Sequence, residues 1–333
     1  MKLISQIDVS QKTVFVRADL DVPVQKSQIA IEGGTRLTNL KSTVSYLLGQ
    51  GAKVIIAGHI DRPQMPDPAL STKQLLIPLQ SILGRPVVFQ EKLNQTTNNQ
   101  LVILENLRFW PGEVANDPAF AKQLASLANI YINEAFGNCH RLHASMVTLP
   151  TLLPHAAGFH LEQEVEELTK LLSGPLRPFV AVVGGAKIET KLPLVTNLSK
   201  IADFVLVGGE LPLEIKHNAL AFGPNVWVAA LTSDSKDIDA PSQIRFSEII
   251  KKSKTVIWNG PLGYYEGGYT AGTLAVAAAI IQSGVYSVVG GGETLEFLAK
   301  NNLISNFSFV SSGGGAMLEF LAGKSLPAVT ALS

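Results

Sequence analysis

The segment from Phe179 to Lys191, FVAVVGGAKIETK, determines how the rest of the chain is interpreted. Its first five residues are apolar and mostly β-branched, a Gly-Gly pair ends this run, and a polar segment with two lysines follows. This order predicts a buried strand, a tight turn and the start of a helix. A helix that begins here places Lys187 and Lys191 on one face, beside glycines that let a ligand approach the backbone. The pattern suits a phosphate chain, although a plain strand–turn–helix with solvated lysines explains it equally well.

The composition describes a chain with a large core and no net charge. Of the 333 residues, 46% are hydrophobic and 16% are charged, and 27 Lys and Arg balance 27 Asp and Glu. Two domains are expected at this length, and the neutral balance argues against nucleic acid as the main partner. The one cysteine, Cys139, excludes an internal disulfide and is typical of a reducing compartment. Without a signal-like start or an apolar run of membrane-spanning length, we expect a soluble cytoplasmic protein with no membrane partner.

Arginines recur after the expected strands of the first half. Apolar strands alternate there with helical segments, which predicts a parallel sheet covered by helices. The arginines that follow a strand or open a helix are Arg36, Arg62, Arg108 and Arg141, with His59 and either His140 or His143 nearby. The helix that carries Arg36 is expected to start at a Gly33-Gly34 turn. Because parallel strands end at one edge of a sheet, the repetition favours an anion site over unrelated surface charges. The histidine spacing matches no zinc pattern.

Glycine turns recur in the same way in the second half. They follow the expected strands at Gly184-Gly185, Gly208-Gly209, Asn259-Gly260, Gly290 to Gly292 and Gly313 to Gly315. Exposed backbone N–H groups at one edge of a sheet suit a nucleotide polyphosphate. The turns match neither the Walker A pattern nor the dinucleotide fingerprint G-x-G-x-x-G.

Together these patterns predict an α/β protein with two doubly wound, parallel-sheet domains of Rossmann-like architecture, joined by a helical hinge. We expect a substrate domain over 1–154, a connecting helix over 155–175 and a nucleotide domain over 176–318. Two phosphate-binding sites on separate domains indicate a phosphotransferase that closes on its substrates. A nicotinamide-dependent dehydrogenase is disfavoured because its fingerprint is absent.

Eight stretches of the chain resemble the phosphoglycerate kinase family. They are VRADLDVP (16–23), GHIDRP (58–63), LENLRFWPGE (104–113), NEAFGNCHRLHAS (133–145), GGAKIETK (184–191), WNGPLGYYE (258–266), GGGET (290–294) and SSGGGAMLEFLAGKSLP (311–327). They follow the family's order and cover nearly the whole chain. The resemblance implies reversible phosphoryl transfer between 1,3-bisphosphoglycerate and Mg-ADP, giving 3-phosphoglycerate and Mg-ATP, by a cytoplasmic monomer of glycolysis and gluconeogenesis. A weak or inactive member that binds one ligand without turnover is the alternative.

The resemblance also implies roles for single residues. Contacts with 3-phosphoglycerate are implied for Asp19, Asp21, Arg36, His59, Arg62, Arg108 and Arg141. Contacts with ADP or ATP are implied for Gly184, Lys187, Lys191, Gly208, Gly209, Asn259, Glu266, Gly292, Glu293 and Thr294. Arg36, Lys191, Gly313 and Gly314 would act on the group in transfer, and Glu293 would be linked to Mg²⁺. The tail from 319 to 333 would return to the first domain.

Four residues and one segment depart from the family pattern. Asp21 stands for a usual Asn, Asp61 for Gly, Thr190 for Asp and Glu293 for Asp. The extra charge of Asp21 is expected to weaken substrate binding unless the carboxylate is paired or protonated. The segment 210–257 is shorter than its counterpart, which predicts a reduced nucleotide domain.

Overall fold

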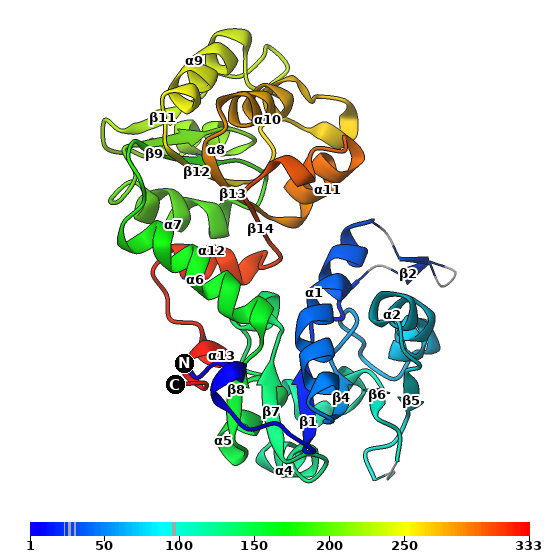
Figure 1. The fold of residues 1–333 in the computed structure, drawn as a ribbon. Helices are drawn as coiled ribbons and strands as arrows, with labels where there is room; N and C mark the ends of the chain where they lie inside the picture. The colour runs from blue at the N-terminus through cyan, green and yellow to red at the C-terminus, as the bar shows by residue number, and fades with distance from the viewer. Residues whose placement is uncertain (23, 26–27, 30, 95–97) are drawn as a thin grey trace. The chain divides into compact units, whose positions relative to one another are not determined.

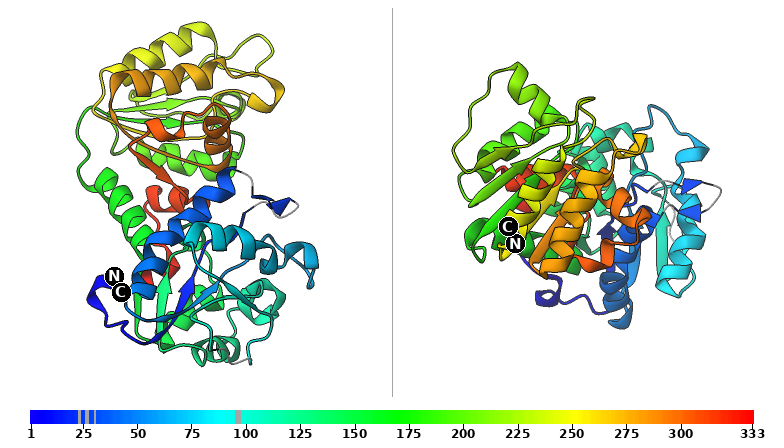
Figure 2. Two further views of the ribbon diagram at one scale, coloured as in Figure 1. Left: turned by 45° about the vertical axis from the view of Figure 1, so that its right-hand side comes forward. Right: turned by 90° about the horizontal axis from the view of Figure 1, so that it is seen from above.

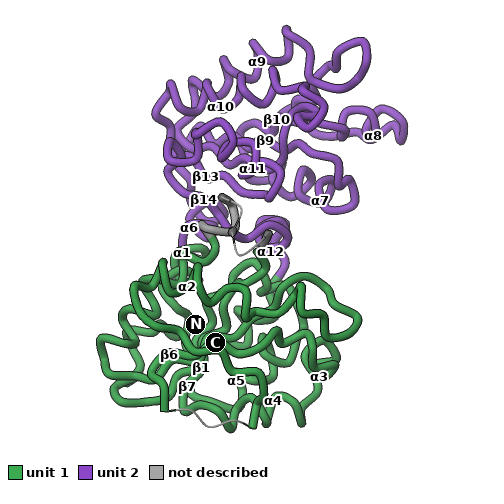
Figure 3. Tube along the Cα trace, turned by 90° about the vertical axis from the view of Figure 1, so that its right-hand side faces the viewer, with its two compact units in different colours: residues 1–165, 325–333 green, residues 166–324 purple. Residues whose placement is uncertain are grey.

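The chain divides into two compact units, each built on its own sheet (Figure 3). The computed structural model describes residues 1–22, 24–25, 28–29, 31–94 and 98–333, so Pro23, the last residue of the first motif, lies outside it. Unit 1 comprises Met1–Val165 with Ser325–Ser333, and unit 2 comprises Glu166–Lys324. The chain passes from one to the other within helix α6 (Phe159–Ser173).

Unit 1 contains a parallel sheet of six strands in the order β5-β6-β4-β1-β7-β8. In chain order these strands are β1 (Thr13–Arg17), β4 (Lys53–Ala57), β5 (Val88–Gln90), β6 (Leu101–Leu104), β7 (Ile130–Asn133) and β8 (His155–Ala157). The central β1 pairs in register with both neighbours, so that Val16 lies beside Ile56 and Ile132. Helices cover both faces of such a sheet, which is why its strands are continuous apolar runs. A small antiparallel pair, β2 (Val24–Gln25) and β3 (Gln28–Ile29), lies outside it.

Helices α1 (Ile31–Gly49) and α2 (Leu76–Leu83) pack together over one face of this sheet (Figure 1). Leu37, Leu40, Val44 and Leu47 recur at helical spacing and are all buried there. Further helices of unit 1 are α3 (Pro111–Val114), α4 (Pro118–Ala125), α5 (Leu149–Leu152) and α13 (Pro327–Thr330). Because α1 begins at Ile31, the expected turn at 33–34 is wrong, and these two glycines lie inside the helix.

Unit 2 repeats this architecture with the strand order β11-β10-β9-β12-β13-β14, again parallel throughout. Its strands are β9 (Phe179–Val183), β10 (Phe204–Val207), β11 (Val226–Val228), β12 (Thr255–Asn259), β13 (Tyr286–Gly290) and β14 (Phe309–Ser311). Its helices are α7 (Ile188–Leu198), α8 (Leu211–His217), α9 (Ala240–Lys251), α10 (Ala271–Ser283), α11 (Gly292–Lys300) and α12 (Gly315–Leu321). Helices α9 and α10 pack together on one face and α7 and α12 on the other (Figures 1 and 2). Two parallel, helix-covered sheets confirm the predicted fold class.

The end of the chain belongs to unit 1. The N–H of Ala328 donates to the carbonyl of Cys139 at 3.1 Å, and the N–H of Lys2 donates to the carbonyl of Leu332 at 3.3 Å. Helix α12 (Gly315–Leu321), whose last turn overlaps the start of the tail expected over 319–333, belongs to unit 2. Within the described part of the chain, no helix combines the length and the apolarity needed to span a membrane.

Candidate functional site

Four arginines gather at the carboxyl ends of the strands of unit 1. Arg17 ends β1, and Arg62, Arg108 and Arg141 lie in the loops after β4, β6 and β7; we call these four residues the arginine cluster. Burial lowers the pKa of Arg108 to about 10, and the neighbouring charge of Arg141 acts in the same direction. The pKa of Arg141 is lowered by burial and by Arg62. Guanidinium groups that repel one another in this way form a site for an anion.

His59 offers this site a hydrogen-bond donor. Its Nδ1 lies 2.9 Å from NH2 of Arg17, and because a guanidinium can only donate, Nδ1 is the acceptor. Burial, reinforced by Arg17 and Arg108, holds the pKa of His59 well below its usual value, so the ring is neutral. Its proton therefore lies on Nε2, a buried atom with no hydrogen-bond partner among the described residues.

A buried network behind the cluster orients Arg17. Nε of Arg17 donates to the hydroxyl of Ser145 at 2.8 Å, and its NH2 lies 4.0 Å from a carboxylate oxygen of Glu113. Glu113, itself fully buried, accepts the N–H of Ser145 at 3.0 Å and lies 3.7 Å from Nδ1 of His143. Burial and the charge of Arg17 lower the pKa of His143 to about 3.

Sequence reasoning missed the two charged residues of this network, Arg17 and Glu113. Both stand inside quoted motifs, Arg17 at the end of an apolar strand and Glu113 at the end of LENLRFWPGE. A charge that closes a fully buried strand is the signal that could have identified Arg17, since such a charge requires a partner.

Three further predicted residues, Asp19, Asp21 and Arg36, lie close to the end of β1. NH1 of Arg36 donates to the carbonyl of Asp21 at 2.6 Å and lies 3.9 Å from a carboxylate oxygen of Asp19. The side-chain amide of Asn138, which comes from the loop after β7, donates to the same carboxylate at 3.2 Å. Asp61 has a φ of +52°, in the left-handed region that favours glycine, which explains the usual Gly at this position. The structure therefore brings all seven predicted substrate residues to one edge of the sheet of unit 1.

In unit 2, the loops after β9, β10 and β12 approach one another backbone to backbone. A Cβ added at Gly184 would collide with the carbonyl of Pro261, and one added at Gly209 would lie 2.5 Å from the N–H nitrogen of Gly185. At Gly208 a Cβ would collide with Leu262 in the interior. Packing alone therefore accounts for glycine at 184, 208 and 209. Gly185 has a φ of +88°, and only a glycine adopts this turn without strain.

The other predicted glycines lie in more open surroundings. No atom lies within 4 Å of a Cβ added at Gly292 or Gly314, so both positions leave room for a ligand. Gly313 is buried, and its N–H donates to the hydroxyl of Ser311 at 3.1 Å. The N–H of Gly313 is thus already engaged within unit 2.

The two predicted lysines differ in their surroundings. Lys187 caps the start of α7 and is exposed, whereas Lys191 is only 6% exposed. Nζ of Lys191 donates to the side-chain oxygen of Asn259 and, at 3.3 Å, to its carbonyl. Burial lowers the pKa of Lys191 to about 8; the charge of Glu293 opposes this shift and that of Lys187 adds to it. Lys191 therefore lies against the end of β12 instead of extending from the helix surface.

Of the predicted residues that remain, Thr294 is turned into the interior. It is fully buried, and its hydroxyl accepts the N–H of Gly260 at 2.8 Å, which holds the turn after β12. Glu293, in the first turn of α11, is half-buried, and Glu266 is exposed in the 3-10 turn Tyr265–Gly267. No cluster of three His, Cys, Asp or Glu able to hold a metal occurs within the described ranges. One carboxylate still suits Mg²⁺, which binds largely through nucleotide phosphates and water.

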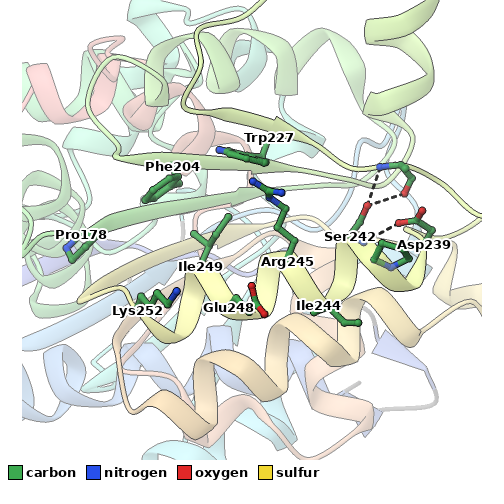
Figure 4. A pocket seen from close by; sticks show the side chains of 12 residues that line it. Pro178, Phe204, Trp227, Asp239, Ser242, Ile244, Arg245, Glu248, Ile249 and Lys252 are labelled. Carbon is green, nitrogen blue, oxygen red and sulfur yellow. Dashed lines mark hydrogen bonds between the residues drawn. The ribbon is translucent and has the colours of Figure 1, made fainter.

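Unit 2 also has an open groove along α9, with a volume of about 600 Å³ (Figure 4). Phe204, Trp227 and Ile249 line it, and the guanidinium of Arg245 lies 3.5 Å from the centre of the Trp227 ring. None of the predicted site residues lines this groove. Most of its lining residues belong to the segment 210–257, which the sequence indicates is shortened, and no residue of the glycine turns lines it.

Comparison with known proteins gives the family. The family model described as phosphoglycerate kinase matches residues 4–219 and 225–324, nearly the whole chain. The chain belongs to the phosphoglycerate kinase family. It is therefore a kinase, and the family predicted from the eight stretches is confirmed. The match is interrupted at 220–224, within the segment that is expected to be short.

Individual relatives of the chain are also phosphoglycerate kinases. The chain is 35% identical to phosphoglycerate kinase of Desulfosudis oleivorans, with 100% of this chain and 98% of the relative covered. It is 37% identical to that of Rhodospirillum centenum, with 99% of each covered. The first comparison spans 391 aligned positions against 333 residues here, so the relative carries segments that this chain lacks.

Solved phosphoglycerate kinases have the same fold. The enzyme from Coxiella burnetii matches with a TM-score of 0.86 at 30% identity, over 99% of this chain and 98% of its own. The enzyme from Pyrococcus horikoshii matches with a TM-score of 0.86 at 28% identity, over 100% of this chain and 98% of its own. This family member thus keeps the two-unit architecture with a shorter chain.

Proposed function

We propose that this phosphoglycerate kinase family member transfers a phosphoryl group reversibly between 1,3-bisphosphoglycerate and Mg-ADP, with 3-phosphoglycerate and Mg-ATP as the other pair. The observation that carries this proposal is a set of unpaired buried N–H donors on two arginines of the cluster and on His59 beside it. Nε2 of His59 and Nε of both Arg108 and Arg141 have no hydrogen-bond partner among the described residues. A buried donor left unpaired destabilises a protein, so its retention supports a ligand that accepts these bonds.

The phosphate and carboxylate of 3-phosphoglycerate supply such acceptors. In the proposed complex, His59, Arg62, Arg108 and Arg141 hold the phosphate. Asp19 and Arg36, at the end of β1, hold the hydroxyl and the reacting carboxyl end. Arginine suits the task because its planar fork binds two oxygens of one phosphate.

Unit 2 holds the nucleotide in this proposal. The open positions at Gly292 and Gly314 admit a phosphate chain close to the backbone, and Lys187 is exposed at the start of α7. Glu293 would contact the Mg²⁺ that the nucleotide brings, and Mg²⁺ would supply neutralisation of phosphate charge. Phosphoryl transfer depends mostly on positioning and on charge stabilisation, and it needs no covalent nucleophile from the protein.

In this proposal the ammonium of Lys191 stabilises the negative charge of the phosphoryl group during transfer. Asn259 holds it at the carboxyl end of β12, and it requires no reorganisation once substrates are bound. Transfer also requires the two substrates to meet, so we propose that the units close on one another during the reaction. We further propose that the enzyme acts as a cytoplasmic monomer.

A coupled assay with 3-phosphoglycerate, ATP and Mg²⁺ tests this function. Formation of ADP at a rate that depends on both substrates and saturates with each is expected. A rate equal to that of a control without enzyme would instead favour the alternative, a family member that binds its ligands without turnover.

Replacing Arg141 with alanine is expected to raise the KM for 3-phosphoglycerate about tenfold to a hundredfold. The variant loses a charge-assisted contact of about 1.5–3 kcal/mol with the substrate phosphate. The KM for ATP is expected to change little, because unit 2 is untouched. Steady-state kinetics with each substrate varied in turn provides the measurement. Equal increases in both KM values would contradict the assignment of the arginine cluster to 3-phosphoglycerate.

A further inference from the structure

Asp21 places a negative charge beside the arginine cluster. Its Oδ1 accepts the N–H of Asp61 at 2.8 Å, and the carbonyl of Asp61 accepts a hydrogen bond from NH1 of Arg108. The carboxylate of Asp21 and the guanidinium of Arg108 are therefore bonded to the N–H and the carbonyl of the same residue, Asp61. The left-handed φ of Asp61, +52°, shapes the turn that presents both groups.

Among the residues that the structure describes, none forms an ion pair with this carboxylate. Arg36 donates to the backbone carbonyl of Asp21 and approaches the carboxylate of Asp19. The charge of Asp21 still reaches the cluster. Burial and Arg141 lower the pKa of Arg108, and Asp21 acts in the opposite direction. Asp21 opposes the lowering of the pKa of Arg141 in the same way. The carboxylate of Asp21 thus partly neutralises the arginines, a role that an anionic ligand would otherwise have.

We propose that Asp21 sets the affinity of the site, because it weakens the binding of phosphorylated anions by acting as a built-in competing anion. This inference rests on the proposed function of the cluster as the 3-phosphoglycerate site. A carboxylate at this position repels the phosphate and the carboxylate of the substrate and partly neutralises the arginines. The site consequently holds its substrate less tightly and releases it faster than the same arginines would without Asp21.

Asp21→Asn tests the charge with little change of shape. The amide oxygen of the variant can still accept the N–H of Asp61, so the turn is preserved. At low ionic strength, the Kd for 3-phosphoglycerate is expected to fall about tenfold, as judged from the Coulomb energy of one partly solvated charge. Isothermal titration calorimetry measures this change. The gain is expected to shrink as salt is added, because salt screens partly exposed charges. The KM should fall without a rise in kcat.

Asp8→Asn is the matched control. Asp8 also accepts a backbone N–H, that of Ser10 at 3.0 Å, but it is exposed and precedes β1, at the opposite edge of the sheet. The Kd of the Asp8→Asn variant for 3-phosphoglycerate should equal that of the wild type. A second variant, Asp21→Ala, removes the charge and the hydrogen bond together, and it should still bind more tightly than the wild type.

The outcomes separate the two proposals. An unchanged or raised Kd in Asp21→Asn, with binding intact in the wild type, would overturn the role of Asp21. A gain that is independent of salt would also overturn it, since electrostatic repulsion requires screening. Failure of the wild type, of Asp21→Asn and of the control to bind 3-phosphoglycerate at all would instead overturn the proposed function.

Discussion

Replacing Lys191 with alanine is expected to lower kcat by roughly two to three orders of magnitude, as the removal of one preorganised stabilising group does elsewhere. Lys191 is 6% exposed, and Asn259 holds its ammonium in place before any substrate arrives. A charge that acts mainly on the transition state appears in kcat, so the KM for ATP should change little. Steady-state kinetics, with folding checked by circular dichroism, provides the measurement.

Lys187→Ala is the matched comparison for this variant. Lys187 is exposed at the start of α7, so its loss should raise the KM for ATP as well as slow turnover. A near-normal kcat in Lys191→Ala would contradict the role of this residue in transfer. Lys187 and Lys191 would then be ordinary lysines at the start of a helix, with no part in the reaction.

The pKa of Lys191, about 8, adds a pH dependence. As pH rises through 8, the ammonium loses its proton and kcat is expected to fall. Stability should respond in the opposite direction. Between pH 8 and the usual value of 10.5, the unfolded chain binds more protons at this lysine than the folded protein, so the contribution of Lys191 to stability increases with pH.

Glu113→Ala is expected to cause the largest loss of stability, about 3–5 kcal/mol, because it leaves the charge of Arg17 buried without its carboxylate. Both side chains are fully buried, with 4.0 Å between their charged atoms. Ser145 also loses the acceptor of its N–H, which lies 3.0 Å from Glu113. Urea unfolding followed by circular dichroism measures the change.

Glu166→Ala is the control for this experiment. Glu166 forms an ion pair with Lys170 at 3.0 Å, but both side chains are more than half exposed, and exposed pairs contribute little. The double variant Arg17→Met with Glu113→Ala should lose less stability than the two single changes added together, since neither charge is then left alone. Equal stability of Glu113→Ala and Glu166→Ala would show that the buried network does not support unit 1.

Much of the fold and part of the site could be predicted from local pattern. Buried strands such as Phe179–Val183 are continuous apolar runs, and both sheets are parallel as their alternation with helices predicts. The convergence of His59, Arg62, Arg108 and Arg141 follows from the same regularity, because every parallel strand ends at the same edge. The sequence by itself thus determined the fold class, the family and one charged edge of unit 1.

Only the tertiary structure decided what each side chain contacts. The spacing of Lys187 and Lys191 predicts one helical face for both. In the structure Lys187 precedes α7 and is exposed, whereas Lys191 is buried against Asn259, 68 residues away in the chain. The pairing of Arg17 with Glu113 likewise joins the end of β1 to helix α3, far apart in the chain. Burial and electrostatic interactions depend on which residues are close in space. Helical or strand periodicity reflects only residues that are close in the sequence, so it does not predict distant neighbours. The environment of Lys191 and the support of Arg17 therefore exist only in the folded chain.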